Sequence, residues 1–415
     1  MKLVKRSEIK GTIPAPPSKS VMLRATAAAL LSNEVSLIRN PSYCQDSLAG
    51  LSIAESLGAE ISKAGQLLRI KGSGALKNKS INCQESGLCM RMFTPIAALY
   101  KEEIVLNGEG SLCLRPMGMM EKPLQTLGAF CRTQAGFAPV RVKGPLKGGL
   151  IRLDSSLSSQ FLSGLLMALP LCAEDSRIMV SNLKSKPYVA LTLSILKRFK
   201  VSVQEEKDFQ FFEIKGSQNF RGTELCVEGD WSAASFLLVA AALCGRVQVT
   251  HLQMDSLQAD KRILEALEIA GAKIEIKSDS ILVEKNCLKA FDFDATDCPD
   301  LFPSLAVLAC ACHGRSRLAG VKRLKHKESD RGQTLLSELT KIGARIAICG
   351  NWMEIEGSQI KGGLIRSHHD HRIAMAAACA GLISEEGVSI EDWECVSKSY
   401  PHFFSDLESI GGRII

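Results

Sequence analysis

Aromatic side chains, proline and long apolar runs are all scarce in this 415-residue sequence. Aromatic residues make up 5% of the chain, which leaves few stacking platforms for the bases of a nucleic acid. The 14 prolines, the lack of low-complexity tracts and a hydrophobic content of 46% exclude wholesale disorder. No apolar run reaches the roughly 18 residues that a membrane-spanning helix needs, so we expect no transmembrane segment.

Signals for targeting and for disulfides are also missing. The stretch from Met1 to Glu8 carries charges but no following apolar run, so we expect no signal or transit peptide. The 15 cysteines are scattered through Ala/Leu-rich segments, where Cys behaves as a small hydrophobe. This favours a reducing, cytoplasmic location. Cys310, Cys312 and His313 lack the paired Cys-x-x-Cys spacing of zinc sites.

The charge balance is modest. The net charge of +7 comes from 51 basic and 44 acidic residues dispersed along the chain. No basic stripe typical of nucleic-acid binding is visible, so small anionic ligands suit this sequence better than a polyanion.

One kind of segment, a polar start followed by an Ala/Leu-rich run, occurs six times at intervals of about 70 residues. The six starts lie near Ser18, Gln84, Ser158, Gly229, Cys298 and His368. A second landmark is a helix end, marked by Gly before a β-type stretch in all but one unit. It falls at Gly58, Gly128, Lys200, Gly271, Gly343 and Gly411. The two landmarks together predict an α/β chain of six units, each with two helices and several strands.

The last unit is cut short at Ile415, and its missing strand needs a partner. The unassigned strand-like stretch is the N-terminal one, residues 1–13, so we expect the two termini to pair. This predicts two three-unit domains, residues 18–228 and residues 1–17 with 229–415, with crossovers near Pro17 and Glu228. The alternative, a linear solenoid, would need atypical capping repeats, which are not evident.

The polar helix starts have two interpretations. A Ser or Asp at such a position is usually an N-cap. However, cations and hydroxyls gather on several first turns, and helix N-termini favour anions. These groups are Ser18-Lys19-Ser20 with Arg24, Gly87 with Arg91, Ser158-Ser159-Gln160, and Asp370-His371-Arg372.

Two carboxylates join this set. Asp300 precedes an apolar helix, where it would ordinarily be a cap, and Glu328 lies in a charged run, residues 325–331, that would ordinarily be a solvated loop. Beside the cationic starts, they would supply acid and base groups inside an anion-binding cleft.

The motifs resemble those of the 5-enolpyruvylshikimate-3-phosphate (EPSP) synthase family, the 3-phosphoshikimate 1-carboxyvinyltransferases. The resemblance is colinear from Pro14 to the C-terminus. It rests on Pro17-Ser18-Lys19-Ser20, Leu114-Arg115-Pro116-Met117, Ser158-Ser159-Gln160-Phe161-Leu162, Ser185-Lys186-Pro187-Tyr188, Val227-Glu228-Gly229-Asp230, Lys327-Glu328-Ser329-Asp330-Arg331, Asp370-His371-Arg372-Ile373-Ala374-Met375 and Lys398-Ser399-Tyr400-Pro401.

The resemblance implies a fold of two lobes, each a threefold pseudo-repeat of βαβαββ units arranged as an inside-out α/β barrel. One lobe takes the N-terminal strand, and the active site lies in the interlobe cleft. The resemblance also implies no metal and no organic cofactor. We expect a monomer, with neither nucleic acid nor membrane as a partner.

The same resemblance implies the substrates and their ligands. Shikimate 3-phosphate would be bound by Lys19, Ser20, Arg24, Ser158, Ser159, Gln160, Ser185, Asp300 and Lys327. Phosphoenolpyruvate would be bound by Lys19, Gly87, Arg115, Gln160, Arg331, Arg372 and Lys398. The implied chemistry is addition followed by elimination, with Asp300 as proton acceptor, Glu328 as proton donor and Lys19 stabilising charge.

The sequence departs from the family pattern at residues 84–91, where a Gly-Asn-Ala-Gly-Thr-type segment is expected. Gly87 and Arg91 are kept, but Leu88 replaces a small polar residue and Glu85 adds a negative charge beside an anion site. The departure bears on affinity for phosphoenolpyruvate and on the response to glyphosate, the family inhibitor. Arg323 stands where an Asn ligand is common, and it is left out of the ligand set.

Three alternatives remain open at this point. UDP-N-acetylglucosamine 1-carboxyvinyltransferases share the fold, but they carry a loop cysteine where this chain has Gly110. A silent binding scaffold would have lost Lys19, Asp300, Glu328 or Lys398, all of which are present. His368, His369 and His371 form a metal cluster, a ligand-positioning segment or a plain loop, and their adjacency to Arg372 and a helix start favours the last two over the first.

Overall fold

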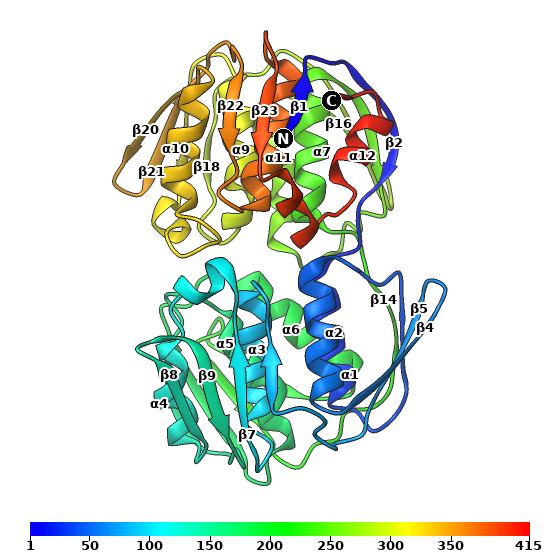
Figure 1. Ribbon diagram of the computed structural model, residues 1–415, viewed down its shortest axis with the longest axis vertical. Coiled ribbons are helices and arrows are strands. Elements are labelled where there is room, and N and C mark those ends of the chain that lie inside the picture. Colours follow the sequence, from blue (N-terminus) through cyan, green and yellow to red (C-terminus); the bar gives the residue numbers. More distant parts are fainter. The chain divides into compact units, whose positions relative to one another are not determined.

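The computed structural model describes all 415 residues, and its internal contacts divide the chain into two compact units. The middle unit comprises Pro17–Val227. The terminal unit comprises Met1–Pro16 and Glu228–Ile415, so both chain ends belong to it (Figure 1). The chain passes between the units twice, after Pro16 and after Val227.

The middle unit contains three four-stranded sheets of mixed direction. In spatial order the first sheet is β14 (Glu224–Cys226), β3 (Ser36–Arg39), β5 (Leu67–Gly72) and β4 (Ala59–Ala64). The second is β6 (Ser80–Asn82), β7 (Glu103–Asn107), β9 (Phe137–Lys143) and β8 (Phe130–Gln134). The third is β10 (Leu150–Asp154), β11 (Ser176–Ser181), β13 (Phe211–Ile214) and β12 (Val203–Glu206). In each sheet the first two strands are parallel and the other neighbours are antiparallel.

The terminal unit repeats this plan. Its sheets are β2 (Ile9–Pro14), β15 (Gly245–Thr250), β17 (Ser280–Glu284) and β16 (Lys273–Ile276); β18 (Asp292–Asp294), β19 (Arg315–Ala319), β21 (Trp352–Glu356) and β20 (Arg345–Cys349); and β22 (Gly363–Arg366), β23 (Val388–Glu391), β1 (Lys2–Lys5) and β24 (Arg413–Ile414). The β-type stretches predicted after Gly271 and Gly343 form the strands β16 and β20, which pair antiparallel with β17 and β21.

Each unit also has six helices. Those of the middle unit are α1 (Lys19–Leu30), α2 (Gln45–Ser56), α3 (Gly87–Ala97), α4 (Glu121–Thr126), α5 (Gln160–Ala168) and α6 (Lys186–Arg198). Those of the terminal unit are α7 (Trp231–Cys244), α8 (Ile263–Ile269), α9 (Phe302–Cys310), α10 (Arg331–Lys341), α11 (His371–Ile383) and α12 (Phe403–Ser409). Short 3-10 turns are η1 (Gly110–Leu114), η2 (Gly118–Met120), η3 (Leu169–Leu171), η4 (Ala259–Arg262), η5 (Pro299–Leu301), η6 (Val321–Leu324) and η7 (Trp393–Lys398).

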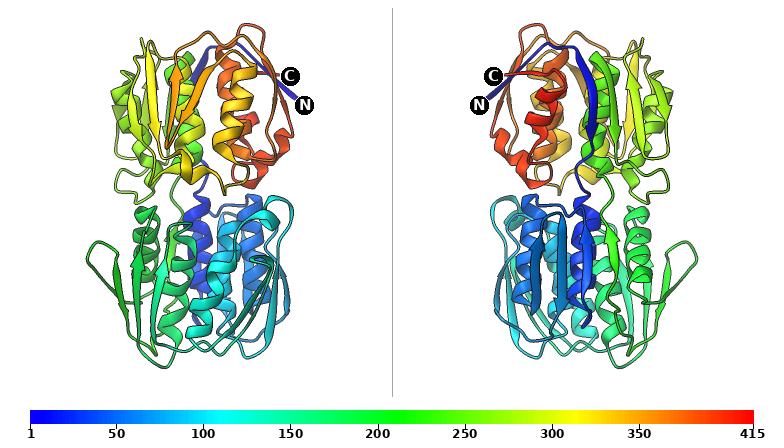
Figure 2. Two further views of the ribbon diagram at one scale, coloured as in Figure 1. Left: turned by 90° about the vertical axis from the view of Figure 1, so that its left-hand side faces the viewer. Right: turned by 90° about the vertical axis from the view of Figure 1, so that its right-hand side faces the viewer.

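The helices that follow the polar starts form the core of each unit. Every residue of α3, α7 and α9 is buried, which explains why α7 and α9 are apolar on all faces rather than amphipathic. Figure 2 shows these helices packed inside each unit, with the sheets on the outside. The α/β fold of repeated helix and strand units is confirmed. No helix is long and apolar enough to cross a membrane.

The two termini meet in the last sheet, as predicted. β1 pairs antiparallel with β23 and with β24. The N-terminal strand is therefore the third strand of the last sheet, a place that each of the other five sequence repeats fills with a strand of its own. The N-terminal stretch differs from the expectation in one respect, because it forms two strands. The second, β2, completes the sheet of the fourth sequence repeat by pairing parallel with β15. A Cβ on Gly245 would lie 1.8 Å from the carbonyl oxygen of Ile9, so only glycine permits this pairing.

We predict that Val4→Ala lowers the free energy of unfolding of the terminal unit by about 2 kcal/mol, because Val4 is fully buried between β23 and β24. Denaturant unfolding measures the change. Val35→Ala, the same substitution at a position that is 42% exposed, is the control and should change the stability by less than about 0.5 kcal/mol. Equal effects of the two substitutions would contradict the proposed role of β1.

Candidate active site

The cationic and hydroxyl side chains singled out in the sequence fall into two groups, one in each unit. The middle half-site consists of Lys19, Ser20, Arg24, Gly87, Arg91, Arg115, Ser158, Ser159, Gln160 and Ser185. The terminal half-site consists of Asp300, Lys327, Glu328, Arg331, Asp370, Arg372 and Lys398.

In the middle half-site, Lys19 is the first residue of α1, directly after the N-cap Ser18. Its Nζ lies 3.0 Å from Oδ2 of Asp46, and the two side chains are only 14% and 8% exposed. Asp46 lies in the first turn of the neighbouring helix α2 and supplies a counter-charge to Lys19. In the sequence, Asp46 resembles an ordinary first-turn acid, and nothing marks it as a partner of Lys19.

Arg24, one turn further along α1, is bound from three directions. Nε donates to Thr192 Oγ1 at 2.9 Å, Nη1 to the carbonyl oxygen of Ser20 and Nη2 to that of Tyr188. Burial lowers the pKa of Arg24 to about 10. Thr192 in turn bonds Ser163 on α5, so this cation joins α1, α5 and α6.

Arg91 and Arg115 lie beside the first turn of α3. Arg91 Nη1 donates to Gln160 Oε1 at 2.9 Å, which links the starts of α3 and α5. A Cβ on Gly87 would come within 2.9 Å of Arg115 Nη1 and 3.4 Å of Arg91 Nη1. Glycine at this position therefore lets both guanidinium groups approach the helix N-terminus, where the backbone N–H groups also favour an anion.

Glu85 approaches Arg115 through Ser111. The Ser111 hydroxyl donates to Glu85 Oε2 at 3.0 Å and accepts from Arg115 Nη2 at 3.2 Å. A Cβ on Gly110 would lie 2.5 Å from Glu85 Oε1, so this carboxylate fits against a backbone without a side chain. Glu85, which departs from the family pattern, is thus linked to Arg115 by hydrogen bonds through Ser111.

Ser20 of the middle half-site is the second residue of α1, and the other three serines lie on loops that lead into helices. Ser158 Oγ accepts from the N–H of Gln160 at 3.1 Å. Ser159, buried, occupies the N-cap position of α5. Ser185 precedes α6 in the left-handed conformation, with φ of 57°, which is unusual for a residue other than glycine and common at binding sites.

The terminal half-site is organised around Arg331, the first residue of α10, which is fully buried. Its Nε lies 3.0 Å from Asp370 Oδ2, Nη1 lies 2.9 Å from Asp300 Oδ1, and Nη2 lies 2.7 Å from Glu328 Oε2. Burial alone would lower the pKa of Arg331, but these carboxylates raise it above its usual value. One guanidinium therefore holds three carboxylates from separate segments.

Asp300 lies in η5 and makes no cap bond, so its default interpretation as an N-cap is wrong. It lies 3.1 Å from Lys327 Nζ, 2.9 Å from Arg331 and 3.4 Å from Arg372. Burial alone would raise its pKa, but Arg372, Lys327 and Arg331 hold that pKa well below its usual value. Asp300 is therefore ionised at neutral pH, while its side chain remains 23% exposed.

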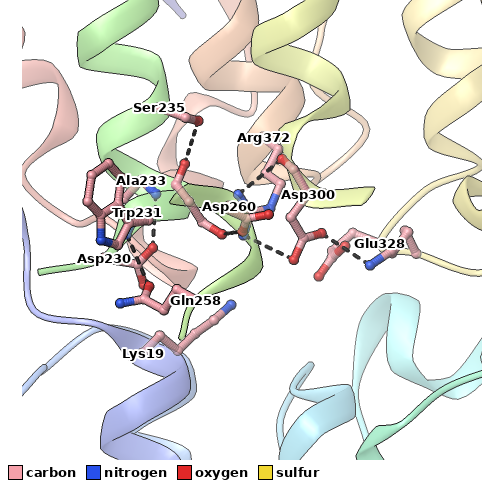
Figure 3. A network of polar contacts seen from close by, with 12 residues as sticks. Lys19, Asp230, Trp231, Ala233, Ser235, Gln258, Asp260, Asp300, Glu328 and Arg372 are labelled. Atoms are coloured by element: carbon pink, nitrogen blue, oxygen red, sulfur yellow. Dashed lines mark hydrogen bonds and ion pairs between the residues drawn. The ribbon is translucent and has the colours of Figure 1, made fainter. Parts of the chain in front are cut away.

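The other cations of this half-site are also buried. Burial lowers the pKa of Lys327, although Asp300 opposes the shift. Burial alone would lower the pKa of Arg372 too, but nearby carboxylates, Asp300 above all, together raise it. In Figure 3, Arg372 lies next to Asp260 and Asp300, and Asp260 and Asp230 also favour its charge. Lys398, the last residue of η7, is 4% exposed.

The N-cap interpretation holds for other starts. Four N-cap side chains accept from the backbone N–H group three residues ahead: Ser18, Ser86, Asp230 and Asp330. Asp370 combines both roles, since it accepts from the N–H of Arg372 and also binds Arg331. The ligand set drawn from the sequence omits Asp370, although its place in the Asp370-His371-Arg372 motif was a signal that could have identified it.

The three histidines point to different surroundings. His368 Nε2 lies 2.9 Å from Glu338, His369 lies 3.9 Å from Asp392, and His371 is buried. No group of three or more His, Cys, Asp or Glu residues is placed to hold a metal ion.

Known proteins resemble this chain along nearly its whole length. Residues 3–407 match the profile of a family described as EPSP synthase (3-phosphoshikimate 1-carboxyvinyltransferase). A 3-phosphoshikimate 1-carboxyvinyltransferase of Clostridium acetobutylicum is 40% identical, covering 98% of this chain and 96% of the relative. One of Methanocorpusculum labreanum is 37% identical, covering 99% and 98%. A solved EPSP synthase of Acinetobacter baumannii has a TM-score of 0.81 and 26% identity, covering 100% of this chain and 99% of its own.

We predict that Arg372→Met raises the pKa of Asp300, because it removes the cation that contributes most to lowering that pKa. A pH titration of the carboxyl ¹³C signal measures the shift, with the resonance identified by its loss in Asp300→Asn. Arg315→Met removes an exposed cation of β19 and should leave the titration unchanged. An Asp300 signal that titrates at the same pH in Arg372→Met and in the wild type would contradict this account.

Proposed function

The chain belongs to the EPSP synthase family and has 3-phosphoshikimate 1-carboxyvinyltransferase activity, and we propose that the two half-sites together carry out the reaction. The enolpyruvyl group of phosphoenolpyruvate is transferred to the 5-hydroxyl of shikimate 3-phosphate in the shikimate pathway. The observation that carries the proposal is that one buried arginine, Arg331, joins Asp300, Glu328 and Asp370 among further buried cations.

Phosphoenolpyruvate has a carboxylate and a phosphate, and both need cations. We propose that Lys19, Arg115, Arg331, Arg372 and Lys398 supply them, with Gly87 and Gln160 completing the pocket. Arginine suits these groups because its planar fork donates two hydrogen bonds at once. Arg331 already binds three carboxylates, so an anion that reaches it must take the place of one. We infer that this exchange releases Asp300 or Glu328 for proton transfer.

We propose that shikimate 3-phosphate binds mainly through the middle half-site. Its phosphate suits the hydroxyls of Ser158, Ser159 and Ser185, and Gln160, Ser20, Arg24 and Lys19 complete the set. Asp300 and Lys327 would reach its hydroxyls from the terminal unit. Ser185 and Ser159 are buried, which supports a site closed around a small ligand.

The proposed chemistry begins with addition. Asp300 takes the proton of the 5-hydroxyl, and the oxygen attacks C2 of phosphoenolpyruvate. Glu328, which takes up a proton from solvent once it is released from Arg331, gives that proton to C3, which becomes a methyl group. Elimination follows when Glu328 removes a proton from that methyl group and the C2–O bond to phosphate breaks. The proton held by Asp300 leaves with the phosphate, and the product is the enolpyruvyl ether. Lys19 and the arginines stabilise the charge that shifts between carboxylate and phosphate.

The low pKa of Asp300 bears on its role as a base. The group is ionised at neutral pH, as a base must be, but a strongly stabilised carboxylate accepts a proton weakly. Substrate anions that bind Arg372 and Lys327 would neutralise part of the charge that stabilises Asp300. We propose that substrate binding therefore raises the pKa of Asp300 and activates it.

One assay distinguishes the proposed reaction from the two alternatives, which are transfer to UDP-N-acetylglucosamine and a binding scaffold without activity. We predict phosphate release from phosphoenolpyruvate with shikimate 3-phosphate and none with the sugar nucleotide. Asp300→Asn and Glu328→Gln should each lower kcat by about 10²–10⁴-fold, because each removes a proton-transferring group. Circular dichroism checks that both variants are folded. Release with the sugar nucleotide alone, or full activity in either variant, would refute the assignment.

Glu85 offers a second test on the proposed phosphoenolpyruvate site. We predict that Glu85→Gln lowers the KM for phosphoenolpyruvate about threefold to tenfold, because it removes a negative charge joined through Ser111 to Arg115. Steady-state kinetics at low ionic strength measure it, with kcat expected within twofold. Glu109→Gln, on the next loop, is the control. A higher KM in Glu85→Gln would show instead that this carboxylate orients the arginine.

We further propose that the enzyme acts as a monomer in the cytoplasm. Its sheets are completed within one chain, since β1, β2 and β14 each close a sheet of their own unit. Sedimentation at micromolar concentration tests the oligomeric state.

A further inference from the structure

The loop that leads into α11 is strained where it carries residues of the terminal half-site. His368 and His369 have φ angles of 52° and 55°, in the left-handed region that residues other than glycine rarely occupy. They come directly before Asp370, the N-cap of α11, and shortly before Arg372. Such a conformation persists only where surrounding contacts hold it in place.

The contacts that hold this loop converge on Glu338, a residue of α10 that is 2% exposed. Glu338 Oε1 lies 2.9 Å from His368 Nε2, and Oε2 accepts from the backbone N–H of Arg366 at 3.0 Å. Lys341 Nζ lies 2.7 Å from both carboxylate oxygens. Burial alone would raise the pKa of Glu338, but His368, Lys341 and the Arg366 N–H lower it, so the carboxylate is ionised and His368 Nε2 is the donor.

Helix α10 therefore binds this loop at two places. Arg331, at its first residue, binds Asp370. Glu338, seven residues on and about 10 Å along the helix axis, binds the loop where it leaves β22. Fixing both ends of the turn fixes the direction in which α11 starts, and Arg372 is the second residue of that helix.

We propose that Glu338 is a positioning residue that holds, through His368 and the Arg366 backbone, the loop that aims Arg372 at phosphoenolpyruvate. The inference rests on the proposed role of Arg372. It gives a function to His368, one of the three histidines that the sequence leaves between a metal cluster and a positioning loop. Glu338 does not itself touch the reacting groups.

The test uses His368→Ala, because this side chain is 45% exposed and its loss should leave the unit folded. We expect the KM for phosphoenolpyruvate to rise about fivefold, with kcat and the KM for shikimate 3-phosphate within twofold. A uniform loss of binding for one substrate is the signature of a misplaced ligand rather than of lost stability. His368→Gln, whose amide can still donate to Glu338, should restore at least half of the effect. Glu338→Gln should shift the KM in the same direction as His368→Ala.

Lys341→Met is the matched control, because it removes the half-exposed partner of Glu338 but leaves the loop contacts intact. It should change neither KM by more than twofold. An equal rise in Lys341→Met, or an unchanged KM in His368→Ala, would overturn the proposal. Arg372→Lys is measured in parallel. If it raises the KM while His368→Ala does not, only the positioning role fails. If Arg372→Lys leaves the KM unchanged, the proposed role of Arg372 fails, and the positioning role fails with it.

Discussion

A fully buried guanidinium bonded to three carboxylates is the interaction on which the terminal half-site depends. Taking the Arg331 charge out of water is unfavourable unless it is paired and its hydrogen bonds are satisfied. Asp300, Glu328 and Asp370 satisfy those hydrogen bonds, and they come from three segments separated by tens of residues. The need to pair one cation therefore brings η5, the loop before α10 and the start of α11 to one place. The positive charge of Arg331 also offsets the repulsion between the carboxylates of Asp300 and Glu328, which both bind it.

The repeat explains why polar groups collect at one end of so many helices. In each of the six sequence repeats, a helix that is buried on nearly all sides follows a strand after a short loop. The apolar body of the helix lies in the core, and its polar first turn lies at the edge of the core. A set of glycines marks the other end. A Cβ on Gly72, Gly144 or Gly357 would lie 1.9, 2.0 or 1.7 Å from the carbonyl oxygen of Leu30, Ala98 or Cys312, at the end of a buried helix. Without a side chain, the strand end can pass the helix end closely, and the same geometry recurs.

The sequence was sufficient for the six buried helices and for the pairing of the chain ends, because apolar runs and glycine helix ends recur with a regular period. It was insufficient for the partners of the charged residues. Asp300 was expected by default to be a cap, yet its partners Lys327, Arg331 and Arg372 follow much later in the chain. Glu338 has the sequence pattern of a surface helix acid beside Lys341, and only folding places His368 against it. Such contacts join residues that are distant in the sequence, so they depend on how the helices and loops pack, which a local sequence pattern does not determine.

The central claim is that Glu328, one of the three carboxyl groups bonded to Arg331, adds a proton to C3 of phosphoenolpyruvate and later removes one. The most direct test runs the reaction in deuterium oxide and measures deuterium in the methylene group of the product by mass spectrometry. Because C3 passes through a methyl group, the account predicts deuterium in that methylene with the wild-type enzyme. A product formed in good yield with an unlabelled methylene would contradict addition and elimination at this site.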